Sequence, residues 1–409
     1  MKKNFFSLII ILFIFIAQMP IVYGENSQSE IPDIYSDSTI LIDFKTGSIL
    51  YSKNAEEKMY PASTTKILTA IIALEKCNLD DIITISSSTI STIPSGYSSA
   101  YLSNGEEISI RDLVTIFLVH SANDAGYVLA EHISGSIDEF AKLMNQKALE
   151  IGCKNTHFTN PSGIHDENHY TTAYDLSLIA KYCMQNSVFR SIVSEQSCII
   201  NSTNKSDVRK YSNTNDLINP SSKYYLKECV GIKTGYTAQA KNCLISACSK
   251  NNLGLICVVL GANQMPNGES SRYLDSIHLF KYGYANYSVR KFVDKDVNFT
   301  NIEIKNGSKD TRNLDLYTDS SVSGLLKNTD SIPEGKIELN NTISAPISKG
   351  SVIGSVTYTV GDNSYSTNLV ASHDVEEDEF LLFVFKIVLG IVLFLILTTL
   401  LFSKSKKKK

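Results

Sequence analysis

Two short apolar runs near the N-terminus predict a β-hairpin. Residues 38–42 and 48–52 are apolar enough to lie inside a sheet, and the turn-rich residues 43–47 join them. The apolar run at residues 67–74 follows and predicts a buried helix that begins at Ser63. The fold is therefore expected to begin with a hairpin and one buried helix.

A long central stretch has apolar residues at helical spacing and predicts a helical subdomain. Its helices are expected at residues 110–120, 124–133, 140–151 and 173–183. Residues 160–170 form a loop by their composition, and residues 201–223 are polar and irregular.

Strand patterns return after the helical stretch. Residues 230–235 are followed by apolar runs at 243–249 and 253–260, which flank Lys250-Asn251-Asn252 and predict an antiparallel hairpin. Residues 272–284 predict a closing helix that runs back over the sheet. Strands, helices, strands and a last helix in this order predict an α+β fold, with helices packed on an antiparallel sheet.

The C-terminal third has a different pattern. Short alternating runs such as 299–304 and 352–360 predict a small all-β domain, and the acidic residues 374–379 follow it. Residues 380–402 are mostly apolar and would span about 34 Å as a helix, enough to cross a bilayer, with Lys386 reaching toward the interface. The lysines at 404 and 406–409 are then cytoplasmic by the positive-inside rule. The alternative, an interfacial helix, would need a polar face that this run lacks.

The N-terminus predicts export. Residues 1–24 combine Lys2 and Lys3 with an apolar run and a plausible cleavage site, as a signal peptide does, although the long apolar run leaves a permanent anchor as the alternative. The predicted organisation is a signal peptide at 1–24, an α+β domain at 33–295, a small β-rich domain at 296–373, an acidic linker at 374–379, a transmembrane helix at 380–402 and a basic cytoplasmic tail at 403–409.

Composition narrows the classes of function. The 43% of hydrophobic residues indicates packed cores rather than disorder. All 42 acidic residues lie between residues 25 and 379, whereas eight of the 38 basic residues lie outside these limits, so the central part is acidic and a broad nucleic-acid-binding face is not expected. The eight cysteines include no Cys-x-x-Cys pair, which argues against a zinc ribbon. Disulfides are permitted in an exported chain, but buried free thiols are common, and the pairing stays open.

The segment Pro61-Ala62-Ser63-Thr64-Thr65-Lys66 carries the candidate chemistry. Residues three apart share a helix face, so the Lys66 amine can reach the Ser63 hydroxyl. A lysine whose pKa is lowered by burial or by neighbouring cations can take the serine proton, and the free N–H groups at the helix start favour negative charge there. The alternative is an N-cap serine beside a solvated lysine, and only partner motifs can decide.

Two partner motifs follow in order, Ser121-x-Asn123 and Lys233-Thr234-Gly235. Each is weak alone, because Ser121 with Asp124 can form a capping box and Lys-Thr-Gly is an ordinary strand-to-turn tripeptide. The joint order is informative, because these three motifs together are those of penicillin-binding proteins and class A β-lactamases, with Asp common at the middle of the second motif.

The sequence resembles the D-alanyl-D-alanine carboxypeptidases among the low-molecular-mass penicillin-binding proteins. The likeness runs from residue 40 to about residue 284 and includes the segments Pro61-Ala62-Ser63-Thr64-Thr65-Lys66, Ser121-Ala122-Asn123-Asp124-Ala125, Asn160-Pro161-Ser162-Gly163, Tyr170-Thr171-Thr172-Ala173 and Lys233-Thr234-Gly235-Tyr236-Thr237. It implies a β-lactamase/transpeptidase-like domain. It also implies a serine-type enzyme that removes the terminal D-alanine from peptidoglycan stem peptides through an acyl-enzyme, with β-lactam antibiotics as covalent inhibitors.

The resemblance implies a role for each candidate residue. The expected catalytic residues are Ser63, Lys66, Ser121 and Asn123, and the expected substrate-binding residues are Lys233, Thr234, Gly235, Tyr236 and Arg272. In this scheme Ser63 attacks the penultimate D-Ala carbonyl, Lys66 is the base, and Ser121 passes a proton to the leaving amine. Asn123 orients the substrate amide, and Lys233 helps to keep Lys66 neutral.

The remaining implied contacts bind the substrate. The backbone N–H groups of Ser63 and Tyr236 match the oxyanion hole of the family. Thr234 matches a position that binds a carboxylate, and Arg272 is the candidate for a second carboxylate contact. Lys241 stands where relatives often have glycine, and a spanning helix would replace the amphipathic anchor of many relatives. No cofactor, metal or nucleic acid is expected, and the enzyme would be a single-pass membrane protein with its catalytic domain on the extracytoplasmic face.

Three other functions are alternatives for these residues. A class A β-lactamase uses a glutamate for deacylation, and the loop at 158–171 offers only Glu167, without the spacing of that family. A non-catalytic wall-binding scaffold would retain the cleft unused, although every named catalytic side chain is present. A zinc peptidase would have to use His165 and His169, which lie in a turn-rich loop and are expected to face solvent.

Overall fold

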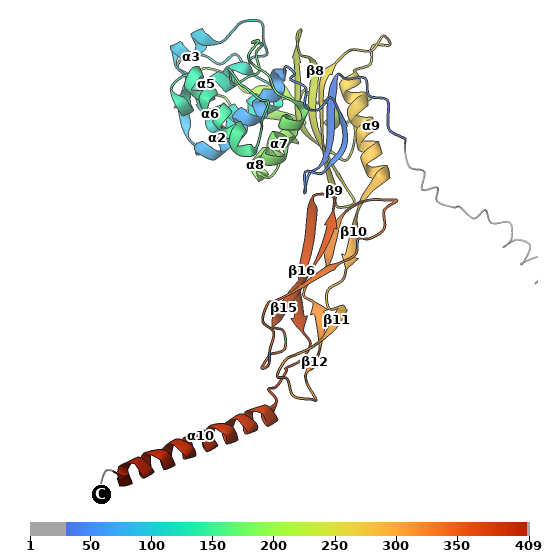
Figure 1. The fold of residues 1–409 in the computed structure, drawn as a ribbon. Helices are drawn as coiled ribbons and strands as arrows, with labels where there is room; N and C mark the ends of the chain where they lie inside the picture. Colours follow the sequence, from blue (N-terminus) through green and yellow to red (C-terminus); the bar gives the residue numbers. More distant parts are fainter. Residues whose placement is uncertain (1–29, 407–409) are drawn as a thin grey trace, which may run out of the picture.

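A computed structural model describes residues 30–406 of the protein (Figure 1). The predicted signal peptide at residues 1–24 lies outside the described residues. Along the described chain a helix-rich part comes first, a set of β-strands follows it, and one long helix ends the chain.

A five-stranded antiparallel sheet forms the centre of the first part, with the strand order β2-β1-β9-β8-β7. Its strands are β1 (Ser38–Asp43), β2 (Ile49–Lys53), β7 (Cys229–Thr237), β8 (Lys241–Lys250) and β9 (Leu253–Ala262). Both predicted hairpins are confirmed. Because β1 pairs with β9, the N-terminal hairpin and the later one belong to a single sheet.

Both faces of this sheet are covered. Ile40 and Ile42 of β1 pack against the helical subdomain, whereas Leu41 packs on the opposite face with residues of α9 (Ser271–Asn286). Side chains alternate along a strand, so a strand that is apolar throughout is stable only when both faces are buried. Figure 1 shows this arrangement, with α2 and α7 on one side of the sheet and α9 on the other.

The predicted helical subdomain is confirmed and contains further elements. Its predicted helices are α2 (Lys66–Lys76), α4 (Ile110–Val119), α5 (Asn123–Ser134), α6 (Ile137–Ile151) and α7 (Ala173–Cys183). The additional elements are α3 (Ser87–Thr92), α8 (Ser187–Val193), and two small antiparallel sheets, β3 (Ile82–Thr84) with β4 (Glu107–Ser109) and β5 (Ser197–Ile200) with β6 (Arg209–Ser212). Residues 201–223 were predicted to be irregular, which is wrong for β6 and for the 3₁₀ turn η2 (Asp216–Ile218). These elements are short and polar, so no apolar run marks them.

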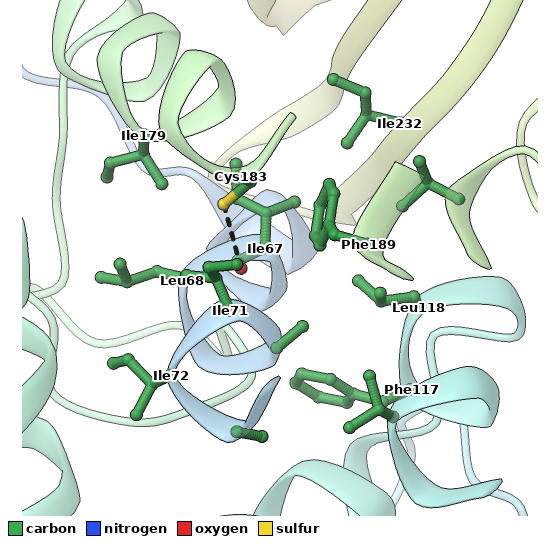
Figure 2. Close-up of a cluster of buried hydrophobic side chains, with 14 of the residues drawn as sticks. Ile67, Leu68, Ile71, Ile72, Phe117, Leu118, Ile179, Cys183, Phe189 and Ile232 are labelled. Carbon is green, nitrogen blue, oxygen red and sulfur yellow. Dashed lines mark hydrogen bonds between the residues drawn. The ribbon is translucent and has the colours of Figure 1, made fainter. Parts of the chain in front are cut away.

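Helix α2 is buried on all sides, from Lys66 to Ala73 (Figure 2). Side chains from α4, α7, α8 and β7 surround it, namely Phe117, Leu118, Ile179, Cys183, Phe189 and Ile232. The Cys183 thiol also donates a hydrogen bond to the carbonyl of Ile67, with an S···O distance of 3.4 Å. A helix that is apolar all round is stable only in such a core, and each fully buried Leu or Ile contributes roughly 1.5–3 kcal/mol. The N-terminal end of α2 is therefore held firmly in place.

Strand β10 (Tyr287–Val293) follows α9 with no residue between them and pairs with β13 (Val322–Lys327). Asn328 closes this junction, because its backbone N–H donates to the carbonyl of Asn286 and its side-chain amide donates to that of Ala285, both at 2.8 Å. The domain boundary between residues 295 and 296 stays a prediction.

A second five-stranded sheet, with the order β11-β12-β16-β15-β14, forms most of the predicted all-β domain, which is confirmed. Its strands are β11 (Asn298–Glu303), β12 (Asn313–Thr318), β14 (Lys336–Leu339), β15 (Val352–Val360) and β16 (Asn363–Ala371). Its core includes Leu314, Leu316, Val356 and Leu369, none of them exposed. Figure 1 shows this domain between the helix-rich part and the final helix.

The final helix, α10 (Glu379–Lys406), covers the predicted transmembrane segment at 380–402. Among the residues that the structure describes, however, no helix is both long enough and apolar enough to cross a membrane. The predicted transmembrane helix is therefore not confirmed.

Candidate active site

Ser63 lies in a 3₁₀ turn, η1 (Ala62–Thr65), which leads directly into α2 at Lys66. The sequence pattern predicted one helix from Ser63 onward, but the first turn is tighter, as is frequent at a helix N-terminus. Residues three apart share a face in either form. Accordingly, Lys66 Nζ lies 2.9 Å from Ser63 Oγ.

Lys66 is fully buried and its amine is surrounded by oxygen acceptors. Besides its contact with Ser63, Nζ donates to Asn123 Oδ1 at 2.7 Å and to the carbonyl of Ser162 at 2.8 Å. Burial, and after it the positive charge of Lys233, holds the pKa of Lys66 well below its usual value. A lysine in this state can be neutral at physiological pH and can accept a proton.

Asn123 is the first residue of α5, and its side chain is fixed from both ends. Its Nδ2 donates to the carbonyl of Ser98 at 2.9 Å, which leaves Oδ1 facing Lys66. The backbone N–H of Asn123 donates to the same carbonyl at 2.8 Å. The second motif is thereby attached to the loop that contains Ser98.

Ser121 lies two residues before Asn123, between α4 and α5, and is 8% exposed. The capping-box alternative is wrong, because Ala122 is the N-cap of α5 and Ser121 has a φ of +66°. Asp124 has a different role. Its carboxylate accepts hydrogen bonds at 2.6–3.1 Å from Ser99 Oγ and from the backbone N–H groups of Ala100 and Leu102. Asp124 thus holds the loop beside Asn123.

The third motif lies on β7, the edge strand of the central sheet nearest to the Ser63 turn. A Cβ atom on Gly235 would lie 3.0 Å from Ser63 N and 3.1 Å from Thr64 N, so a larger residue would push the strand away from the turn. Lys233 is 1% exposed, and burial, followed by the charge of Arg272, lowers its pKa to about 7. The strand therefore brings a second buried lysine close to Lys66.

Arg272, the second residue of α9, reaches the same strand. Its Nη1 donates to the carbonyl of Gly235 at 3.4 Å, and its guanidinium lies over the ring of Tyr273 at 4.7 Å. Its Nε is buried and has no hydrogen-bond partner among the described residues. Thr234 Oγ1 lies 2.5 Å from Thr214 Oγ1. The positive charge of the guanidinium, held against the carbonyl of Gly235, suits recognition of a carboxylate.

Family models match most of the chain. The model described as D-alanyl-D-alanine carboxypeptidase matches residues 25–264, and the model described as penicillin-binding protein 5, C-terminal domain, matches residues 287–377. The chain belongs to the D-alanyl-D-alanine carboxypeptidase family. As a member of this family it is a serine-type hydrolase that acts as a D-Ala-D-Ala carboxypeptidase.

Relatives and solved structures agree with this assignment. The chain is 33% identical over 330 residues to D-alanyl-D-alanine carboxypeptidase DacF of Bacillus subtilis, an alignment that covers 78% of this chain and 80% of the relative. It is 32% identical over 355 residues to DacA of Haemophilus influenzae, covering 85% and 86%. Penicillin-binding protein 5 from Haemophilus influenzae has a similar structure, with a TM-score of 0.64, 29% identity, and coverage of 85% of this chain and all of that one.

The carboxypeptidase site also contains groups that the sequence did not reveal. The carbonyl of Ser162 contacts Lys66 through the backbone, which no side-chain motif encodes. Gly163 makes this contact feasible, because it has a φ of +78° and a Cβ there would lie 1.8 Å from the carbonyl oxygen of Ala62. The segment Asn160-Pro161-Ser162-Gly163, predicted as the start of a loop and included in the family likeness, was the available clue.

His169 contradicts the expectation that the loop histidines face solvent, because it is 2% exposed. Its Nε2 lies 2.9 Å from Thr65 Oγ1, and its Nδ1 accepts from the backbone N–H of Thr159 at 3.1 Å. Burial lowers the pKa of His169 to about 3, so the ring is neutral and supports the Ser63 turn from behind. His165 is partly buried against the ring of Tyr60.

Three further residues on or beside the third motif and its hairpin have distinct surroundings. Thr214, from the segment predicted to be irregular, contacts Thr234 directly. Tyr236, which follows the third motif, is 65% exposed. Lys241 has a φ of +56°, the conformation that a glycine would adopt readily, and its Nζ pairs with Asp37 at 2.7 Å.

Proposed function

We propose that this carboxypeptidase cleaves the terminal D-alanine from peptidoglycan stem peptides through an acyl-enzyme on Ser63. The observation that carries the proposal is the set of contacts of Lys66, whose buried amine touches Ser63, Asn123 and Ser162. A buried lysine with a lowered pKa beside a serine hydroxyl is an activated pair.

In the acylation step Ser63 Oγ attacks the carbonyl carbon of the penultimate D-Ala, and neutral Lys66 takes the hydroxyl proton. The backbone N–H groups of Ser63 and Tyr236 then bind the oxyanion. The close approach of Gly235 to Ser63 N supports this assignment, because it brings the two backbone segments together.

The tetrahedral intermediate collapses when the bond to the terminal D-Ala nitrogen breaks. Ser121 passes a proton to this nitrogen, so D-alanine leaves as a neutral amine, and Asn123 holds the amide of the substrate. Thr234 and Arg272 bind the carboxylate of the departing D-alanine, and the contact of the Arg272 guanidinium with the carbonyl of Gly235 is the supporting observation. Water then hydrolyses the ester on Ser63 and frees the shortened peptide.

Release of D-alanine from a pentapeptide that ends in D-Ala-D-Ala tests the reaction. Full-length wild-type protein should release D-alanine, and Ser63→Ala should lose at least about 10³-fold of kcat/KM, because the nucleophile is gone. Ser221→Ala, at an exposed serine, is the matched control and should keep full activity.

A fluorescent penicillin tests the acyl-enzyme separately, since β-lactams are expected to acylate the same serine. Wild type should carry one covalent label and Ser63→Ala none. Equal labelling of both proteins, or an unlabelled wild type, would refute the role of Ser63 and favour a scaffold.

We also propose that the C-terminal helix attaches the enzyme to the membrane, with the catalytic domain on the extracytoplasmic face. The apolar residues of α10 support this, as Phe380, Phe385 and Phe394 are 65–70% exposed, and the lysines after residue 403 suit a cytoplasmic end. The β domain then separates the active site from the membrane. Full-length protein should stay with the membrane fraction in carbonate at high pH, whereas a chain ending at residue 378 should be released; equal release would disprove the anchor.

A further inference from the structure

Two cysteines lie directly opposite each other in the central sheet. Cys229 on β7 and Cys248 on β8 are register partners in the antiparallel ladder. Both belong to the cluster packed between the sheet and α9, so their side chains lie on the same face. The Cys229 thiol donates to the carbonyl of Gly231 at 3.4 Å, and neither thiol has a part in the proposed reaction.

The position of the pair meets the geometric requirement of a disulfide. Directly opposed residues of an antiparallel ladder have Cα atoms about 4.5–5.5 Å apart. A disulfide needs a Cα separation of about 4.4–6.8 Å. The usual spacing of directly opposed residues is therefore compatible with a disulfide between the two strands.

The neighbouring cysteines do not meet this requirement. Cys257 on β9 is opposite Ser246, so it lies diagonally to Cys248, at about 7–8 Å. Cys229 and Cys257 are two strands apart and displaced by two residues along the strand, at about 12 Å. Cys243 is opposite Gly235 and packs on the other face of the sheet. Within this cluster the geometry selects one pair.

We propose that Cys229 and Cys248, both free thiols in the structure, form a disulfide that joins β7 to β8 when the enzyme meets a disulfide oxidant. The Cys229 thiolate attacks one sulfur of the oxidant and releases the other as a thiol, which leaves a mixed disulfide. The Cys248 thiolate then attacks Cys229 Sγ and releases the second thiol. Two protein thiols are oxidised to one disulfide, and the oxidant is reduced to two thiols.

Exposure sets the order of these two steps. Cys229 is partly exposed, whereas Cys248 is 2% exposed, so the oxidant reaches Cys229 first. Burial is the main cause that raises the pKa of Cys248, so the second step is the slower one. The proposed extracytoplasmic location would supply the oxidising surroundings, but the chemistry itself does not depend on the carboxypeptidase reaction.

The bond would restrain the strand that contains Lys233. The ladder shifts register between Cys229 and Ile232, where Gly231 has a φ of +116°, so the pair lies at a bulge. A bulge interrupts pairing and is a place where an edge strand can separate from its neighbour. A covalent link at Cys229 would hold the start of β7 against β8 on the side of the bulge away from the active site.

Treatment of full-length enzyme with oxidised glutathione under native conditions tests the proposal. The wild type should lose 2 Da, and a non-reducing peptide map should show a Cys229–Cys248 link. The melting temperature should rise by roughly 3–10 °C and fall back with dithiothreitol. Cys257→Ser is the matched control and should form the same link, whereas Cys229→Ser and Cys248→Ser should not show the reversible rise.

Three results would overturn the proposal. They are stable glutathionylation of Cys229 without the loss of 2 Da, a link to Cys257 instead, and no reaction before the protein unfolds. Each of these results is read from the mass and the peptide map. Failure of the proposed carboxypeptidase reaction would instead appear as absent D-alanine release from a protein that still forms the Cys229–Cys248 link.

Discussion

The two folded parts of the enzyme differ most in the polar groups that they bury. The α+β part buries Lys66, Lys233 and Asp275, each at most 1% exposed. Among the described residues of the second sheet, at 298–371, the polar side chains classed as buried are two threonines, Thr318 and Thr367. Burying a charged group costs free energy, so its presence calls for a compensating role. Asp275 is satisfied by the N–H groups of Tyr35 and Ser36, whereas Lys66 and Lys233 lie in the candidate active site, so the buried amines are the charges whose cost we attribute to function.

Replacement of Lys66 gives the sharpest test of this difference. Lys66→Met keeps the length of the side chain but removes the base, so D-alanine release should fall at least about 10³-fold. The free energy of unfolding should change far less than the activation free energy of the reaction. Removing the buried amine stabilises the fold, whereas the loss of a hydrogen-bond donor to Asn123 and Ser162 destabilises it, so the two effects partly cancel. Lys76→Met, at the exposed end of the same helix, is the control and should change neither quantity. If Lys66→Met fails to fold, Lys66 is needed for stability, and the proposed difference between the two parts is wrong.

Lys233 should make stability depend on pH. Its pKa is about 7 in the folded enzyme against 10.5 when unperturbed, so between these values the unfolded chain binds a proton that the folded chain does not. The free energy of unfolding should therefore rise with pH, by up to about 1.4 kcal/mol per pH unit from this group. Urea unfolding between pH 7.5 and 9.5 should show a smaller rise for Lys233→Met than for wild type. Lys250→Met, at an exposed lysine of β8, should keep the wild-type slope; parallel slopes for all three proteins would contradict the prediction.

A buried threonine of the β domain should affect stability alone. Thr318 Oγ1 donates to the carbonyl of Asp294 at 2.7 Å and accepts from the N–H of Val297 at 3.0 Å. Thr318→Val should lose about 1–2 kcal/mol of stability, because the carbonyl of Asp294 and the N–H of Val297 each lose a hydrogen-bond partner, and should keep wild-type kcat/KM. Thr359→Val, at an exposed position of β15, is the control for the same change of side chain. Lower activity of folded Thr318→Val would show that the β domain also influences catalysis.

Thr214 should affect substrate binding rather than the chemical step. Its hydroxyl lies 2.5 Å from that of Thr234, and valine in its place would remove this contact at nearly the same volume. Thr214→Val should raise KM about tenfold, equivalent to about 1.4 kcal/mol, with a smaller effect on kcat. Steady-state kinetics with the pentapeptide measure both constants. An effect confined to kcat would show that Thr214 acts on the chemistry instead.

Lys241 should show the smallest effect. Its φ of +56° strains a lysine by about 1–2 kcal/mol, whereas its half-exposed ion pair with Asp37 contributes about 0–1 kcal/mol. Lys241→Gly removes both the backbone strain and the ion pair. Glycine also increases the conformational entropy of the unfolded chain, which offsets part of the stability gained from the relief of strain. The free energy of unfolding by urea should change by less than about 1 kcal/mol. A larger loss would mean that the tie to Asp37 holds the β7–β8 hairpin in place.

Much of this architecture could be predicted from the sequence. The apolar runs revealed both hairpins and the helices from α4 to α7, because burial imposes a period on the residues that face a core. The spacing of Ser63 and Lys66 placed their side chains together, since the local geometry is the same in a 3₁₀ turn and an α-helix. Lys233 and Asn123 could be linked to them only through family resemblance, because tertiary structure brings these segments together.

Other features could not be predicted. The contact of Ser162 with Lys66 uses a backbone carbonyl, which every residue type possesses. Thr214 lies in a segment whose polar composition suggested only a loop. His169 was expected to be exposed because polar neighbours surround it in sequence, yet tertiary packing buries it behind Thr65. In each case the decisive neighbour is distant along the chain.

The direct passage from α9 into β10 has a mechanical consequence. No loop separates α9 from β10, and Asn328 is bonded to Asn286 and Ala285, so the β domain joins the catalytic domain through a short, braced connection and can act as a stalk for the active site. If α10 attaches that stalk to a membrane, the enzyme would cleave peptide ends that lie within a limited range of distances from the membrane. The thickness and spacing of the surrounding polymer, rather than a search by a swinging domain, would then decide which ends are trimmed.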